Sequence, residues 1–171
     1  MILSREGIEV LKECEQFRSV PYNDGGGDGN VNTIGYGHFI RPKESFTVIT
    51  PEAAAVLLEE DVSKHEDCVA TVCKGLDISQ PQFDAMVMLC YNIGCRAFST
   101  STLVKKLQAN DMVGARNEFK RWNKEKKGGQ YVVAHGLIKR RYVERLVWSG
   151  DYVEATKVAE GAKWDYNESL L

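Results

Sequence analysis

The stretch that decides the fold is residues 8–38, which read IEVLKECEQFRSVPYNDGGGDGNVNTIGYGH. Its first part has the apolar spacing of a helix, with Ile8 and Leu11 on one face. Glu15 projects between these two apolar residues and not onto the charged face. An apolar setting disfavours the charged form of a carboxyl group, which suits a general acid at neutral pH. The alternative is a buried carboxylate satisfied by an arginine or a backbone amide, and the helical spacing alone leaves both interpretations open.

A second carboxylate, Asp24, follows nine residues later. Pro21 blocks continuation of the helix, so we expect the helix to end near residues 17–20. The glycine-rich residues 25–30 are typical of a turn, and the next residues are typical of a returning strand. The sequence therefore predicts a small β-hairpin, with Glu15 and Asp24 flanking one cleft. Two carboxyls in unlike environments are what glycoside hydrolysis requires.

These features resemble the active-site signature of the phage-type lysozymes, which are the muramidase endolysins of glycoside hydrolase family 24. The signature consists of Glu15, eight residues, Asp24, and then TIGYGH at residues 33–38. Five further motifs of the family follow in the same order: ITPEAA at 49–54, QFDAM at 82–86, YNIG at 91–94, FSTSTL at 98–103 and GLIKRR at 136–141. Each motif is weak by itself, but together they cover about residues 4–150.

The resemblance implies a role for each residue of the signature. Glu15 is the general acid, Asp24 is the second carboxylate, and Thr33 helps to place the attacking water. By position in the family's pattern, the implied substrate-binding residues are Phe39, Tyr91 and Ser101. The resemblance suggests inversion at the sugar carbon, and it implies no metal and no cofactor.

The loop between Asp24 and Thr33 is longer than the family usually has, because eight residues intervene. Asp28 in this loop is therefore an alternative candidate for the second catalytic carboxylate. We favour Asp24, because the residues that precede it, 17–22, match the family's pattern. For His38 we favour a structural role, in which a carboxylate accepts its hydrogen bond and holds the hairpin against the rest of the chain, over a role in the cleft.

The implied fold class is α+β and mostly α: a lysozyme-like fold with a small β-hairpin lobe and a larger helical lobe joined by a long helix. We expect residues 1–171 to form one domain. The expected parts are a hairpin lobe at about 14–49, a linking helix at 50–65, a helical lobe at 66–150 and a tail at 151–171. Thr50 and Ser79 are expected N-caps, and the second opens a helix that is apolar on nearly all sides. Residues 123–129 are expected to be a mobile basic loop, and the tail either adds a short helix or is disordered.

The five cysteines are odd in number, and we expect no secretory signal, which together argue against a disulfide framework. Cys68, Cys73, Cys90 and Cys95 have gaps at the loose end of zinc-ligand spacing. Cys90, however, lies in a strongly apolar helix. We therefore expect free, mostly buried thiols and no metal site.

Charge is uneven along the chain. Residues 116–145 hold ten Lys or Arg and three Asp or Glu, within a net charge of −2. A positive face suits an anionic polymer such as peptidoglycan or nucleic acid. Nucleic acid would favour aromatic side chains among the basic residues or a recognisable binding module, but only Trp122 and Tyr131 qualify and no module appears. This excess of positive charge is consistent both with a solvated helical face and with a face that steers peptidoglycan.

We therefore expect an endolysin-type muramidase that hydrolyses the β-1,4 bond between N-acetylmuramic acid and N-acetylglucosamine and lyses bacterial cells. The alternatives are a non-catalytic cell-wall-binding or virion structural module on the same scaffold, and a secreted antibacterial toxin with the same chemistry. We expect a monomer that is made in the bacterial host cytoplasm and acts on the cell wall after release. Its expected partners are peptidoglycan and a holin or other export route, without nucleic acid or stable membrane insertion.

Overall fold

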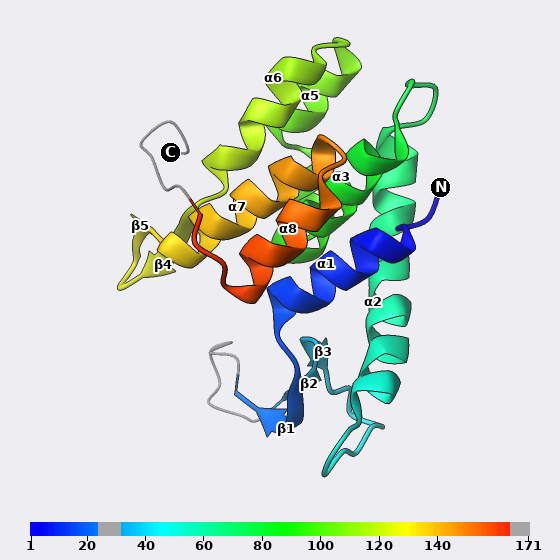
Figure 1. The fold of residues 1–171 in the computed structure, drawn as a ribbon, viewed down its shortest axis with the longest axis vertical. Coiled ribbons are helices and arrows are strands. Elements are labelled where there is room, and N and C mark those ends of the chain that lie inside the picture. The colour runs from blue at the N-terminus through cyan, green and yellow to red at the C-terminus, as the bar shows by residue number, and fades with distance from the viewer. Residues whose placement is uncertain (24–31, 165–171) are drawn as a thin grey trace.

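The chain folds into a mostly helical body with a small antiparallel sheet at one end (Figure 1). The computed structural model describes residues 1–23 and 32–164. The helices are α1 Arg5–Glu15, α2 Pro51–Val72, α3 Gln80–Ile93, α4 Cys95–Ser99, α5 Thr102–Gln108, α6 Met112–Glu118, α7 His135–Trp148 and α8 Tyr152–Glu160, with a 3-10 turn at Phe119–Arg121. The strands are β1 Arg18–Tyr22, β2 Thr33–Gly35, β3 His38–Phe39, β4 Lys124–Lys127 and β5 Gln130–Val133.

Helix α3 forms the centre of the helical lobe, as its apolar sequence predicts. Every residue from Phe83 to Cys90 is buried, and the helix packs against α1, α2, α4 and α7. Ser79 and Gln82 form the expected capping box, and Gly94 ends the helix with φ +84°. A helix buried on all sides needs its terminal backbone groups satisfied locally, and these caps do so.

The hairpin lobe is a sheet of three strands in the order β1-β2-β3, with antiparallel neighbours. It has a small core of its own around Ile34, Ile49 and Ala54. Gly35 lies so close to α2 that an added Cβ atom would come within 2.9 Å of the Ala54 Cβ, and its φ of +66° also favours glycine. The sheet therefore packs directly against the start of α2.

Helix α2 links the two lobes, and one of its ends lies beside the sheet while the other lies among the helices (Figure 1). Thr50 caps it, since its side chain accepts a 3.3 Å hydrogen bond from the Ala53 amide, and Pro51 is its first residue. The helix continues to Val72, seven residues beyond the expected end at residue 65.

Helix α1 ends at Glu15, so the prediction of an end near residues 17–20 is wrong. Gln16 stops it, with φ +57° and ψ +127°, and turns the chain directly into β1. Pro21 therefore lies inside that strand. Positive φ is unusual for a residue with a side chain. Because position 16 is not a glycine, the sequence gives no signal that the helix ends there.

This backbone geometry predicts that Gln16→Gly stabilises the protein. A non-glycine residue in a sparsely populated region costs about 1–3 kcal/mol, whereas glycine adds about 0.5–1 kcal/mol of unfolded-chain entropy. We expect the free energy of unfolding, measured by urea denaturation, to rise by about 1 kcal/mol. Glu13→Gly, within the regular part of α1, is the control and should lower it by about 1 kcal/mol. A loss of stability in Gln16→Gly would contradict the strain argument.

Residues 124–133 form a hairpin, which corrects the prediction of a mobile basic loop. Strands β4 and β5 pair in register from Lys124 with Val133 to Lys127 with Gln130. Gly128 and Gly129 make the two-residue turn, with φ of +56° and +86°. Turns of this kind require positive φ at both positions, which a pair of glycines provides.

The tail contains α8, which is one of the two outcomes the sequence left open. Its Asp151 side chain caps the helix by accepting from the Glu154 amide, and α8 packs against α1 and α7. The Tyr152 hydroxyl donates to Asp84 at 2.7 Å, and Trp164 stacks on Tyr142. Over the part of the chain that the structure describes, no helix is both long and apolar enough to cross a bilayer.

Candidate active site

Glu15 lies at the last position of α1, where the chain leaves the helical lobe for the sheet. Its side chain is 17% exposed, and its Oε1 accepts a 2.5 Å hydrogen bond from the Arg140 guanidinium on α7. Arg140 is itself 10% exposed. The two residues therefore form a largely buried ion pair between the first helix and the seventh.

This pair is the arrangement that the second interpretation of Glu15 describes, a buried carboxylate satisfied by an arginine. The apolar setting is only part of the environment, because a guanidinium contacts one carboxylate oxygen. Helical projection shows which face Glu15 occupies on its own helix but not what another helix brings to it. Arg140 belongs to the GLIKRR motif, so the sequence does mark it as a family residue. The motif does not indicate, however, that Arg140 pairs with Glu15, which lies 125 positions away.

A further carboxylate in contact with Arg140 is Glu144, on the same helix α7. It is fully buried, and its Oε1 lies 3.4 Å from Arg140 Nε and 2.7 Å from an Arg141 guanidinium nitrogen. Arg141 also donates to the Asn92 side-chain oxygen at 2.8 Å, just before the end of α3. Two carboxylates and two guanidiniums thus form one charge-balanced cluster.

Burial and pairing act against each other in this cluster. Burial raises the pKa of Glu144, although Arg141 and Arg140 work in the opposite direction. Burial alone lowers the pKa of Arg140, but the nearby Glu15, Cys14 and Glu144 raise it overall. Arg140 therefore stays charged, and it fixes one oxygen of Glu15.

The other oxygen of Glu15 faces the turn between β2 and β3. A Cβ atom placed on Gly37 would lie 3.6 Å from Glu15 Oε2 and 3.8 Å from the Tyr91 hydroxyl oxygen. The Tyr91 hydroxyl donates to the Tyr36 carbonyl at 3.3 Å, which joins the helical lobe to the hairpin. Burial raises the pKa of Tyr91, and Glu15 adds to this, so its phenol remains a proton donor.

The remaining predicted residues lie at separate places. Thr33 is buried in β2, and its hydroxyl donates to the Asn32 side chain at 3.0 Å. Phe39 in β3 is 58% exposed. Ser101 is buried and caps α5 by accepting from the Val104 amide at 3.3 Å. Asp24, like its competitor Asp28, lies outside the described residues.

The structural role of His38 is confirmed. Its Nδ1 lies 2.6 Å from Asp61 Oδ2 on α2, and its Nε2 lies 3.0 Å from Glu44 Oε2. The Arg41 amide and the His38 ring together lower the pKa of Glu44. Arg41 also pairs with Asp61 at 3.0 Å. The histidine therefore holds β3 and the following loop against the linking helix.

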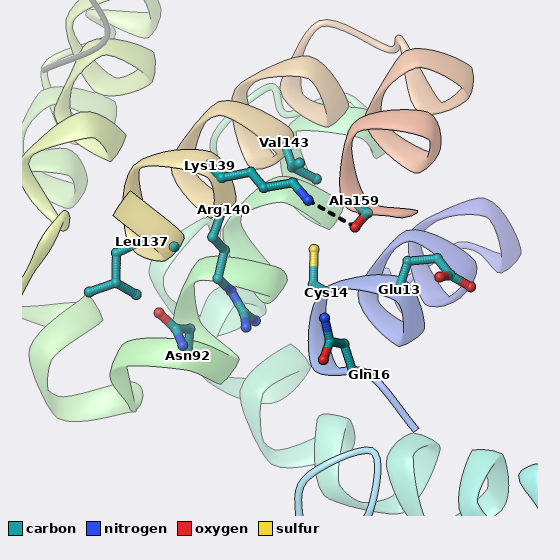
Figure 2. A pocket seen from close by; sticks show the side chains of 10 residues that line it. Glu13, Cys14, Gln16, Asn92, Leu137, Lys139, Arg140, Val143 and Ala159 are labelled. Carbon is teal, nitrogen blue, oxygen red and sulfur yellow. Dashed lines mark hydrogen bonds between the residues drawn. The ribbon is translucent and has the colours of Figure 1, made fainter. Parts of the chain in front are cut away.

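A pocket of about 270 Å³ lies next to this site (Figure 2). Its wall includes Cys14 and Gln16, the chain neighbours of Glu15, together with Asn92 and Arg140, but not Glu15 itself. Lys139 crosses it to donate to the Ala159 carbonyl at 3.1 Å. Arg140 therefore both contacts Glu15 and lines the pocket.

Comparisons with known proteins agree on one family. The family model described as "Phage lysozyme" matches residues 12–144. An endolysin of Bacillus phage B103 is 39% identical over 148 residues, which are 86% of this chain and 54% of that protein. An endolysin of Acyrthosiphon pisum secondary endosymbiont phage 1 is 38% identical over 148 residues, which are 86% of this chain and 98% of that protein. This chain thus spans about half of the first relative and nearly all of the second.

A solved structure extends the likeness to the fold. The endolysin from Escherichia coli O157:H7 phage FAHEc1 superposes with a TM-score of 0.78 at 34% identity, covering 86% of this chain and 93% of that one. The mostly helical fold with a small sheet is thereby confirmed as lysozyme-like.

Proposed function

This chain belongs to the phage lysozyme family, and from that premise we propose that it is a muramidase. It hydrolyses the β-1,4 bond between N-acetylmuramic acid and N-acetylglucosamine in peptidoglycan and so lyses bacterial cells. The observation that carries the proposal is the placement of Glu15 between the lobes. Arg140 holds one of its oxygens, and the other faces the turn of the hairpin lobe.

In the proposed reaction Glu15 donates its proton to the glycosidic oxygen as the bond to the sugar carbon breaks. Asp24 takes a proton from a water molecule that attacks the same carbon, and Thr33 helps to place that water. Arg140 is a positioning residue, because it fixes the Glu15 carboxyl without touching the sugar. Inversion requires the two carboxyls to be about 6.5–9.5 Å apart, against about 5 Å for retention. The reaction needs no cofactor.

For substrate binding we propose Tyr91 and Phe39 on the strength of their positions. Tyr91 shares the neighbourhood of the Glu15 carboxylate. Phe39 offers an exposed ring of the kind on which a sugar face packs. Ser101 is proposed from the family's pattern alone, since its hydroxyl already caps α5.

The proposed setting is a monomer made in the bacterial host cytoplasm and released to the cell wall through a holin or another export route. A non-catalytic wall-binding or virion structural module on the same scaffold is the alternative, and the clearing activity of Glu15→Gln distinguishes the enzyme from it. A secreted antibacterial toxin would use the same site, so the two differ in the neighbouring immunity protein and not in the chemistry.

The choice of second carboxylate gives a direct prediction. We expect Asp24→Asn to lower the rate of peptidoglycan hydrolysis by about 10²-fold or more, because the neutral amide cannot take a proton from water. Asp28→Asn, the matched control in the same loop, should keep a rate within about threefold of wild type. Hydrolysis of purified sacculi measures both rates. The opposite pattern would assign the role to Asp28.

The products of sacculus digestion test the proposed activity itself. We expect borohydride reduction of the released fragments, followed by mass spectrometry, to give N-acetylmuramitol at the new reducing ends. N-acetylglucosaminitol would instead show cleavage of the other glycosidic bond. A 1,6-anhydro sugar would show that water is not the nucleophile. Either product would overturn the proposal.

A further inference from the structure

Three metal-binding side chains converge where α2, α3 and α4 meet. His65 Nδ1 lies 3.6 Å from Cys90 Sγ and 3.5 Å from Cys95 Sγ. The two sulfur atoms are 3.8 Å apart. His65 and Cys90 are buried, and Cys95 is partly buried. The proposed hydrolysis uses none of these groups.

The separations match the edges of a tetrahedral zinc site. With zinc–sulfur bonds of about 2.3 Å and zinc–nitrogen bonds of about 2.0–2.1 Å, two sulfur donors lie about 3.8 Å apart, and a sulfur and a nitrogen about 3.6 Å apart. All three observed distances agree with these values to about 0.1 Å. A disulfide would instead hold its sulfurs about 2.0 Å apart, and both cysteines are free.

Cys68 is the candidate for a fourth donor. It follows His65 by three residues on α2, so both side chains lie on one face of that helix. Its Sγ lies 3.8 Å from the Cys95 carbonyl oxygen and 3.3 Å from Ser99 Oγ. A divalent cation removes the penalty of bringing thiolates together in this place.

We propose that His65, Cys68, Cys90 and Cys95 bind one zinc ion in a closed structural site. Thiolate and imidazole are the donors that zinc prefers, and four protein donors leave no open position for catalysis. Each cysteine that binds the ion releases its thiol proton to solvent. The zinc-ligand spacing considered in the sequence groups Cys73 with the other three cysteines, and free thiols are expected instead. The folded chain replaces Cys73 by His65, which lies eight positions earlier on α2.

The zinc site contacts the active site through its ligand His65. It joins α2 to the last part of α3 and to the first residue of α4. The His65 ring packs edge-on against Tyr91, with ring centres 5.2 Å apart. Tyr91 in turn reaches the hairpin lobe through the Tyr36 carbonyl. Binding of zinc thus stiffens the wall of the cleft near Glu15.

Metal content of the full chain tests the site. We expect protein produced with zinc, kept reduced and then desalted, to retain about one zinc ion per chain. Cys90→Ser and Cys95→Ser should retain at least about tenfold less. Cys73→Ser is the matched control, because Cys73 is a buried free thiol outside the cluster, and it should retain zinc as wild type does. Wild type that stays metal-free, or equal loss in Cys73→Ser, would overturn the proposal.

Cobalt titration decides the matter if the cluster variants fail to fold. Chelator-stripped wild type should develop a thiolate-to-cobalt charge-transfer band that saturates at about one equivalent, and zinc should remove it. At free zinc about 100-fold above the dissociation constant, the melting temperature should rise by about 5–10 °C in wild type and in Cys73→Ser. A titration without that band, or with no saturation, would exclude the site whether or not the chain cleaves peptidoglycan.

Discussion

Glu15→Gln is expected to lower the rate at which the protein clears outer-membrane-stripped bacteria by about 10²–10⁴-fold, the range that a positioned general acid contributes. The amide keeps the size of the side chain and still accepts the hydrogen bond from Arg140. It has no proton to give to the leaving oxygen. The loss should therefore appear in the chemical step while the chain stays folded, which circular dichroism and the melting temperature can show.

Glu13→Gln is the matched control for this experiment. Glu13 lies two residues earlier on α1 and its side chain is exposed, so removal of its charge leaves the Arg140 pair untouched. We expect clearing within about twofold of wild type. If Glu15→Gln clears bacteria as fast as Glu13→Gln, the enzyme interpretation fails, and a wall-binding module becomes the better account.

The sequence predicts this site as far as local signals reach. Thr50 and Ser79 begin helices where capping rules place them, because a cap involves residues within one turn of each other. The burial of α3 likewise follows from its own composition. The partner of Glu15 is different in kind. Arg140 reaches it only after α7 has packed against α3, and no periodicity in either segment encodes that meeting.

Two further differences have the same physical origin. The end of α1 depends on the positive φ of Gln16, a conformation for which glutamine has no local preference. The proposed zinc donors combine two residues of α2 with Cys90 on α3 and Cys95, the first residue of α4. Considering the spacing of four cysteines, we expect no metal site from the sequence, whereas packing brings His65 together with Cys90 and Cys95. Sequence reasoning therefore works for caps and buried faces, and misses pairs made by distant helices.

Glu144→Gln should produce the largest loss of stability among the substitutions considered. Glu144 is fully buried and is shared by Arg140 and Arg141. Its removal leaves Arg141 without its carboxylate partner and Arg140 with Glu15 as its remaining carboxylate in the cluster. Removing one partner of a buried ion pair typically costs about 3–5 kcal/mol, because the other charge stays buried without compensation. For a chain of this size that corresponds to a fall in melting temperature of about 6–20 °C.

Urea denaturation of four variants, among them Arg141→Met alone, separates charge from packing. Glu144→Gln should lose the full amount, and Glu160→Gln, an exposed position on α8, should change stability by less than about 0.5 kcal/mol. The double variant Glu144→Gln/Arg141→Met should recover part of the loss, since it restores the balance of buried charge. A double variant that loses the sum of both single effects would mean that side-chain packing stabilises this region, and that the balance of charge around Arg140 does not.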